Sequence, residues 1–242
     1  MTKVELVART QGVGLYNELD SGGIVEAVAR HGKIKDYGKL ITFLMKHKHW
    51  SPLEHVHFTF LIETSRDVSA QAMRHRSLHM QELSQRYDVI QDLMPVELRL
   101  QADKNRQSSS VSIGTIEFPS SGGGFTIYSA INEKGEFVAN GKQLGAMRGL
   151  ARAILEAREA YKECVDAGIA RECARRGLPM CAKTVIHLTG NLRDFLAYIN
   201  VRAEESTQKE HREVALGIGA ALEREFPKFK ETFPNWEQGN FM

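Results

Sequence analysis

The sequence predicts one α/β domain, and three observations carry this prediction. Apolar residues occupy every second position from Val56 to Ile62, a period that indicates a strand with one buried face. Residues 150–161 and 214–226 each carry an apolar stripe at helical spacing. No internal repeat and no linker-like segment divides the chain of 242 residues, so we expect a single domain over residues 1–242.

The elements of the amino-terminal half follow in order. Residues 4–8 (VELVA) are typical of a strand, and a turn over residues 20–23 precedes a helix over residues 24–30. Asp36 is suited to cap the next helix, where apolar residues recur at helical spacing up to Leu44. After the strand at 56–62, Asp67 is expected to cap a short helix that runs to about Arg76.

Residues 107–140 interrupt this pattern. The turn-forming pieces SSS, SSGGG and NEKGE alternate there with short β-prone pieces. We expect an inserted ribbon or flap of two or three strands, because aromatic and branched residues lie between the turns; disorder is the lesser alternative. In the carboxyl-terminal half, residues 184–188 are expected to form a strand between the two helical stripes.

The composition is that of an ordinary soluble protein, with 42% apolar and 26% charged residues. The formal net charge of +2 gives no general attraction for a polyanion. The first ten residues lack a signal-peptide core, and no apolar run reaches the roughly 18 residues that span a bilayer. Three cysteines without CxxC spacing favour a reducing cytoplasm. We therefore expect a cytoplasmic protein with no membrane partner.

The densest polar chemistry lies in residues 74–87 (RHRSLHMQELSQRY). The planar forks of arginines suit phosphate oxygens, and a serine hydroxyl with loop N–H groups adds further donors. Gln71 lies three residues before Arg74 and is expected on the same helix face. Glu82 either holds the arginines in place or accepts from a ribose hydroxyl. The stretch thus predicts a site for a phosphorylated small molecule. A solvated basic face is the bland alternative, which is the commoner meaning of a charge run.

This stretch resembles the signature of the flavin-dependent thymidylate synthases (the ThyX family), which is close to RHRxxSxNExSxRY. The matching residues are Arg74, His75, Arg76, Glu82, Ser84, Arg86 and Tyr87. Two positions depart from the pattern, because His79 replaces a common serine and Gln81 a common asparagine.

Further matches to that family occur in order along the chain. Residues 49–60 (HWSPLEHVHFTF) resemble its H-x-[ST]-P-x-E-H segment, and residues 99–107 resemble a segment that follows the signature. Residues 175–179 resemble its RxxLP element and residues 189–193 its TGNxR element. Arg202, with Gln208 and Glu210, resembles its R-x5-Q-x-E helix. Ala197 departs from a position that is often Asn or His.

The resemblance implies an α+β fold in which helices flank a mixed or antiparallel sheet, without a Rossmann nucleotide site. It also implies a methyltransferase that converts dUMP to dTMP. The bound cofactor would be FAD, the one-carbon donor 5,10-methylenetetrahydrofolate and the reductant NADPH. No enzyme nucleophile takes part in that reaction. The family further implies a homotetramer in which several chains contribute to each active site.

Carried over residue by residue, the resemblance assigns three groups. The expected catalytic residues are Arg202, beside the pyrimidine, and His49, near the flavin ring. The expected dUMP contacts are Gln71, Arg74, Glu82, Leu83, Ser84, Gln85, Arg86, Arg175 and Arg202. The expected FAD contacts are Ser51, Glu54, Arg74, His75, Arg76, Gln81, Glu82, Asn191 and Arg193.

Two other readings compete with this one. The histidines at 47, 49, 55 and 57 suggest a metal site, but their spacing matches no common zinc pattern, and no metal is expected. A nucleic-acid-binding module could use the RHR stretch with Arg171, Arg175 and Arg176, although the near-neutral charge lacks its footprint. No P-loop and no complete GxGxxG occurs.

Overall fold

The computed structural model describes residues 2–33, 35–90, 92–120, 123–226 and 228–242. Contacts within the chain divide it into two compact units. Unit 1 comprises residues 64–69 and 82–184, and unit 2 comprises residues 2–63, 70–81 and 185–242.

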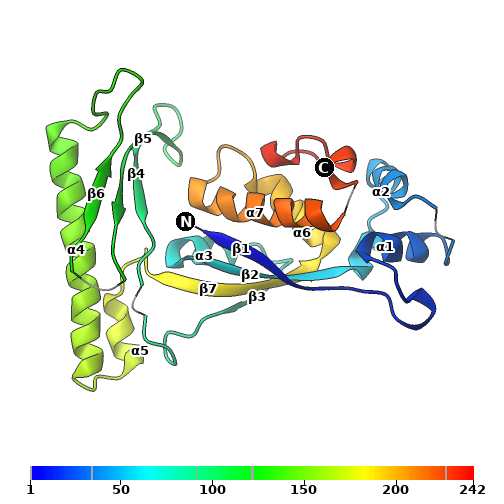
Figure 1. Cartoon of the computed structure of the whole chain (residues 1–242), viewed down its shortest axis with the longest axis horizontal. Coiled ribbons are helices and arrows are strands. Elements are labelled where there is room, and N and C mark those ends of the chain that lie inside the picture. Colours follow the sequence, from blue (N-terminus) through cyan, green and yellow to red (C-terminus); the bar gives the residue numbers. More distant parts are fainter. Residues whose placement is uncertain (1, 34, 91, 121–122, 227) are drawn as a thin grey trace. The chain divides into compact units, whose positions relative to one another are not determined.

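Unit 2 is built on a four-stranded sheet of order β1-β2-β7-β3. These strands are β1 (Lys3–Arg9), β2 (His57–Ser65), β7 (Lys183–Asn191) and β3 (His79–Glu82), and the ends of three of them extend into unit 1. Strands β1 and β2 pair antiparallel, with Val4 opposite Ile62. Helices α6 (Leu192–Arg202) and α7 (Lys209–Glu225) lie along one face of this sheet (Figure 1).

The core of unit 2 lies between that sheet face and the two helices. The alternation from Val56 to Ile62 buries Phe58 and Phe60 of β2, as the period of two predicts. The Phe60 ring meets the Phe195 ring of α6 nearly at right angles, with centroids 5.0 Å apart. The apolar stripe of α7 buries Val214 and Ile218, so burial of these faces fixes both helices on the sheet.

Glycines in α7 allow two close approaches. A Cβ on Gly217 would lie 2.7 Å from a methyl carbon of Val4 in β1. A Cβ on Gly219 would lie 2.1 Å from the Trp236 ring, which is buried in the carboxyl-terminal segment. The absence of a side chain therefore lets β1 and the carboxyl-terminal segment pack directly on the helix.

The carboxyl-terminal segment is fixed to α6. Short helix α8 (Phe229–Thr232) and a 3-10 turn (Trp236–Gln238) precede it. The backbone carbonyl of Asn200 accepts from the N–H of Asn240 at 2.9 Å. The side-chain oxygen of Asn200 accepts from the N–H groups of Phe241 and Met242, at 2.6 and 2.9 Å.

The amino-terminal helices of unit 2 begin at capping aspartates. Helix α1 (Ser21–Ala29) starts at Asp20, whose carboxylate accepts from the N–H of Gly23 at 2.7 Å. The expected turn over residues 20–23 is therefore wrong, because an aspartate cap lets the helix begin before its apolar residues. Helix α2 (Tyr37–Lys46) starts at Asp36, the cap that the sequence predicts. A 3-10 helix, η2 (Ser51–His55), leads into β2, and another (Gly14–Tyr16) follows β1.

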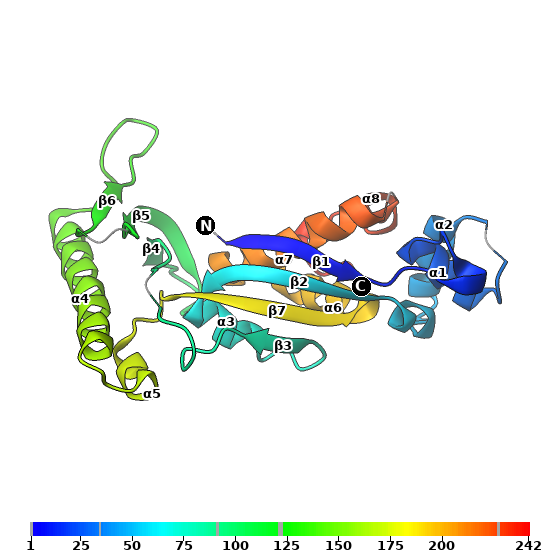
Figure 2. The same ribbon diagram turned by 60° about the horizontal axis from the view of Figure 1, so that its bottom comes forward.

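Unit 1 consists of a three-stranded antiparallel sheet and a long helix. The strands β4 (Val96–Gln101), β5 (Ser109–Glu117) and β6 (Thr126–Ser129) follow one another in space as in sequence. Helix α4 (Gly141–Asp166) runs beside them (Figure 2). Asn140 and Gln143 form a reciprocal capping box at its start. The segment 107–140 thus contains β5 and β6.

The core of unit 1 joins that sheet to α4 and the short helix α5 (Arg171–Ala174). Ile116 of β5 and Ile154 of α4 are buried in this cluster. The Tyr161 ring is buried as well, and its hydroxyl accepts from the N–H of Ile90 at 3.2 Å. The hydroxyl therefore satisfies a buried backbone donor.

Two helix boundaries differ from the sequence prediction. Helix α3 spans Arg66–Ala72, so Arg74 lies in a turn beyond its end and does not share a helix face with Gln71. The R-x5-Q-x-E pattern does not form one helix, because Arg202 ends α6 and Glu210 lies in the first turn of α7. Helical spacing alone does not reveal where a helix stops when no glycine or proline marks its end.

Substitution of Gly219 tests the close packing of α7. Gly219→Ala forces Trp236 to move, and we expect a loss of about 1–3 kcal/mol of unfolding free energy. Gly145→Ala in α4 is the matched control, because nothing lies within 4 Å of its added Cβ; a gain of about 0.5–1 kcal/mol is expected there. Urea unfolding followed by circular dichroism measures both. Equal stability of the two variants would contradict the packing argument.

Candidate active site

The carboxyl-terminal end of α6 carries Arg202 beside three aromatic rings of unit 2, those of Tyr198, His211 and the half-buried His75. Tyr198 lies one helical turn before Arg202, and its hydroxyl is 2.8 Å from Nε2 of His211 in α7. The His75 ring stands perpendicular to the Tyr198 ring, with centroids 5.2 Å apart. Tyr198 and His211 are both fully buried. The Nε atom of Arg202 is buried as well and has no bonding partner among the described residues.

The electrostatics of these four residues keep both histidines neutral. Burial, with the charge of Arg202 and the neighbouring His75, lowers the pKa of His211 to about 4. Burial and Arg202 also lower the pKa of His75, against a smaller opposing effect of Asp194. Burial raises the pKa of the Tyr198 hydroxyl. At neutral pH the positive charge here therefore belongs to Arg202.

Other residues predicted to bind the nucleotide lie close by in unit 2. Gln71 donates from its side-chain amide to the side-chain oxygen of Gln208. Arg74 and Arg76 follow in the turn after α3, and both are exposed. Within the described part of the chain, neither guanidinium group makes an ion pair. Exposed, unpaired guanidinium groups are suited to an anionic ligand.

Several of the residues predicted to contact the flavin lie where η2 packs against α6. Arg193 forms an ion pair with Glu54, and its guanidinium carbon lies 5.6 Å from the centre of the Trp50 ring. Asn191 caps α6 by accepting from the N–H of Asp194 at 3.0 Å. Ser51 is exposed at the start of η2.

His49 lies in the loop between α2 and η2. Its ring is exposed, 6.1 Å from the His47 ring and 6.3 Å from the Phe43 ring. Over the described residues, no three histidine, cysteine, aspartate or glutamate side chains group as metal ligands.

All but one of the remaining predicted residues belong to unit 1. Glu82 forms an ion pair with Arg66 and accepts from the Thr184 hydroxyl at 2.9 Å. Arg86 pairs with Glu172 at 3.1 Å, in an exposed position. The Arg86 N–H lies 3.4 Å from the Ser84 hydroxyl oxygen. Gln85 is buried and Leu83 packs on the core, while Arg175 is exposed in the turn after α5.

Gln81 is exposed on β3 in unit 2. The sequence-predicted residues thus fall into distinct sets, one around Arg202, one around Arg193 and one around Glu82. The ion pair of Glu82 with Arg66 joins it to a residue outside its own stretch.

Five residues that contact the predicted site residues, or lie beside them, were not identified from the sequence. They are Trp50, Arg66, Thr184, Tyr198 and His211. A signal existed for His211, because it lies three residues before Val214 and seven before Ile218. It therefore continues the apolar stripe of α7 as a polar ring. The others give no local spacing signal, since each meets its partner through the tertiary fold.

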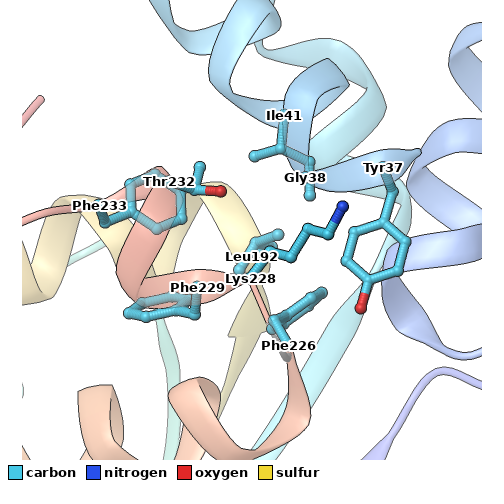
Figure 3. A pocket seen from close by; sticks show the side chains of 9 residues that line it. All are labelled: Tyr37, Gly38, Ile41, Leu192, Phe226, Lys228, Phe229, Thr232 and Phe233. Carbon is cyan, nitrogen blue, oxygen red and sulfur yellow. The ribbon is translucent and has the colours of Figure 1, made fainter.

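A small pocket lies elsewhere in unit 2, between α2 and α8 (Figure 3). Its lining is mostly apolar, with Lys228 at one side, and none of the predicted site residues belongs to it. Lys228 forms an ion pair with Asp36 at 2.6 Å. This contact lowers the pKa of Asp36 and raises that of Lys228. The pocket is thus a packing feature beneath the α2 cap and carries none of the site chemistry.

The α+β fold of this chain carries the exposed, unpaired Arg74 and Arg76, whose guanidinium groups suit an anionic ligand. A family model described as thymidylate synthase complementing protein (Thy1) matches residues 8–228. The chain therefore belongs to the flavin-dependent thymidylate synthase family, a family of flavoprotein methyltransferases, as the sequence resemblance predicts.

Individual relatives agree with this assignment. The chain is 34% identical over 189 residues to a probable flavin-dependent thymidylate synthase of Paramecium bursaria Chlorella virus 1, covering 78% of this chain and 76% of the relative. It is 32% identical over 192 residues to the flavin-dependent thymidylate synthase of Synechocystis, covering 79% and 78%.

A solved structure has the same fold. The UMP/dUMP methylase PolB from Streptomyces cacaoi, bound with 5-Br UMP, superposes with a TM-score of 0.70. The match covers 99% of this chain and 96% of PolB at 24% sequence identity. The predicted α+β fold with antiparallel sheets and helices is thereby confirmed. No helix of the described residues is long and apolar enough to cross a membrane.

The buried neutral state of His211 predicts a pH dependence of stability. Its pKa is about 4 in the folded chain against 6.5 in the unfolded chain. The unfolded chain therefore binds the proton first as pH falls, and stability is lost below pH 6.5. We expect a slope of about 1.4 kcal/mol per pH unit from this group, levelling off below pH 4.

Urea unfolding at pH values from 7 to 4 measures this slope. His211→Phe removes the titrating group, so its stability curve should be flatter than that of the wild type over the same interval. Parallel curves would show that His211 is not neutral in the folded chain.

Proposed function

We propose that this protein methylates dUMP at C5 to give dTMP, with FAD as bound cofactor. In this proposal 5,10-methylenetetrahydrofolate is the one-carbon donor and NADPH the reductant. The observation that carries the proposal is the guanidinium of Arg202, which lies beside the neutral rings of Tyr198 and His211. An ion pair with a described carboxylate does not neutralise it.

Such a cation suits a reaction in which negative charge develops on a pyrimidine ring. A fixed guanidinium stabilises that charge most strongly where burial reduces screening by water. His211 and Tyr198 are neutral at working pH. Tyr198 therefore does not form an ion pair with Arg202, and His211 does not add a second positive charge beside it. In the proposal Arg202 contacts the pyrimidine, and His49 lies near the flavin ring.

The nucleotide contacts are proposed for each unit separately. In unit 2, Gln71 and Arg74 would contact dUMP along with Arg202; the exposed, unpaired state of Arg74 supports a phosphate role. In unit 1 the proposed dUMP contacts are Glu82, Leu83, Ser84, Gln85, Arg86 and Arg175. The free guanidinium of Arg175 is available for an anion, because it makes no ion pair within the described residues.

The residues proposed for FAD fit a dinucleotide in their chemistry. Arg74 and Arg76 offer unpaired forks for a diphosphate, and the amide nitrogen of Asn191 makes no bond to a described residue. Ser51, Glu54, His75, Gln81, Glu82 and Arg193 complete the proposed set. The chemistry that FAD supplies when bound is electron transfer from NADPH to the one-carbon unit.

Two potential nucleophiles, Cys181 and Ser84, support a route without covalent catalysis by the enzyme. Burial raises the pKa of the Cys181 thiol to about 11, so it stays protonated and unreactive at neutral pH. The Ser84 hydroxyl contacts a backbone N–H, at 3.4 Å. No histidine bonds to it within the described residues, and an unactivated hydroxyl is a poor nucleophile.

The first test is an absorbance spectrum of the purified protein, followed by anaerobic addition of NADPH. We expect flavin bands that bleach, and dTMP formed only when dUMP and 5,10-methylenetetrahydrofolate are both present. UMP is assayed in parallel, because the 2′-hydroxyl is the difference that separates the two substrates. If the protein methylates UMP and not dUMP, UMP replaces dUMP as the proposed substrate. If the protein does not bind added FAD, the proposal is wrong.

Substitution of Arg202 tests the role of its charge. Arg202→Ala should lower dTMP formation by at least about 100-fold, the loss expected when one charge-stabilising group is removed, while FAD stays bound. Arg224→Ala is the matched control, because this exposed arginine occupies the last turn of the neighbouring helix α7. Near-normal turnover of Arg202→Ala would remove this residue from the mechanism.

We also propose a homotetramer in which several chains contribute to each active site. Apolar side chains exposed on unit 1, among them Ile131 and Phe137, would be covered in such an assembly. Light scattering that gives the mass of one chain, with full activity, would contradict shared sites.

A further inference from the structure

A hydrogen bond between two helices lies directly beneath Arg202. Tyr198 in α6 and His211 in α7 are joined through Oη and Nε2 at 2.8 Å, and neither side chain is exposed. Tyr198 is four residues before Arg202, so both lie on one face of α6. The bond therefore ties that face to α7 one turn before the arginine.

A second tie follows one residue after Arg202. The Nε–H of Arg212 in α7 donates to the backbone carbonyl of Ala203 at 2.7 Å. Ala203 is the C-cap residue of α6, and carbonyl groups at the end of a helix lack partners within the helix. Arg202 is thus held between two links to α7, although its own Nε makes no bond to a described residue.

The ring on the other side of Tyr198 belongs to the RHR stretch. His75 packs edge-on against Tyr198, and the charge of Arg202 helps to lower the pKa of His75. The groups that face His211 are thus Tyr198 and Arg202 of α6 and His75 of the turn after α3. Nδ1 of His211 is buried without a partner among the described residues. A neutral imidazole leaves Arg202 as the only charged member of this group.

We propose that Tyr198 and His211 form a positioning pair that fixes the guanidinium of Arg202. The pair touches no reacting atom and acts by holding α6 against α7 at that turn. The proposal rests on the proposed function for its effect on turnover. Its effect on the arginine itself is independent of the reaction.

The first readout is the Nε–H resonance of Arg202 in arginine-labelled protein, assigned by its loss in Arg202→Lys. In the wild type, burial of Nε predicts a dispersed and slowly exchanging signal. Tyr198→Phe and His211→Phe should each move this signal to the position of an exposed arginine. His211→Gln keeps a hydrogen-bonding group near Nε2 and should restore much of the wild-type signal. An unchanged resonance in both phenylalanine variants would overturn the positioning role.

The second readout is turnover of dUMP. Tyr198→Phe and His211→Phe should each lower kcat at least about tenfold with KM nearly unchanged, since small misplacements of a catalytic group are costly. The double variant should lose little more than either single variant, because both remove the same bond. Tyr161→Phe is the matched control, since it also removes a buried hydroxyl from a hydrogen bond; it should keep its kcat.

The two readouts separate the two proposals. A wild type that forms no dTMP, with an Arg202 signal that still depends on His211, contradicts the proposed function and leaves the pair in place. Normal kcat in both phenylalanine variants, or equal loss in Tyr161→Phe, contradicts the pair while the function stands.

Discussion

The contact of Phe60 with Phe195 determines where the chemistry of unit 2 lies. These rings, 5.0 Å apart, hold α6 on the sheet by burial of apolar area. Helix α6 begins with the Asn191 cap and Arg193, continues through Tyr198 and ends at Arg202. A helix of 11 residues rises about 1.5 Å per residue, so these groups are spread along a single rigid element.

The elements that the sequence predicted best are those whose period follows directly from burial. The alternation around Phe58 and Phe60 gave β2, and the stripe from Val214 to Phe226 gave α7. Asp36 was recognised as a cap because its carboxylate serves the first free N–H groups of a helix. Helix ends were predicted less well. No glycine or proline near Ala72 indicates that α3 ends there. Because the helix does end at Ala72, Arg74 lies in a turn.

The candidate site was predictable in its residue types and less so in its pairings. Arginines, a glutamate and histidines in one short stretch indicated an anionic ligand, and the family assignment agrees with this reading. Glu82 contacts Arg66 and Thr184, which lie 16 and 102 residues away in the sequence. Tyr198 and His211 meet across two helices. Such contacts depend on tertiary packing and leave no period in the sequence.

The hydrogen bonds of Asn200 to the last three residues affect where an affinity tag can be placed. Its backbone and side-chain oxygens accept from Asn240, Phe241 and Met242, and Arg202 lies only two positions further along α6. An affinity tag fused after Met242 would pull on these bonds, and the strain would reach the helix that carries the arginine. A tag at the amino-terminal end of the chain, joined ahead of β1, leaves them undisturbed.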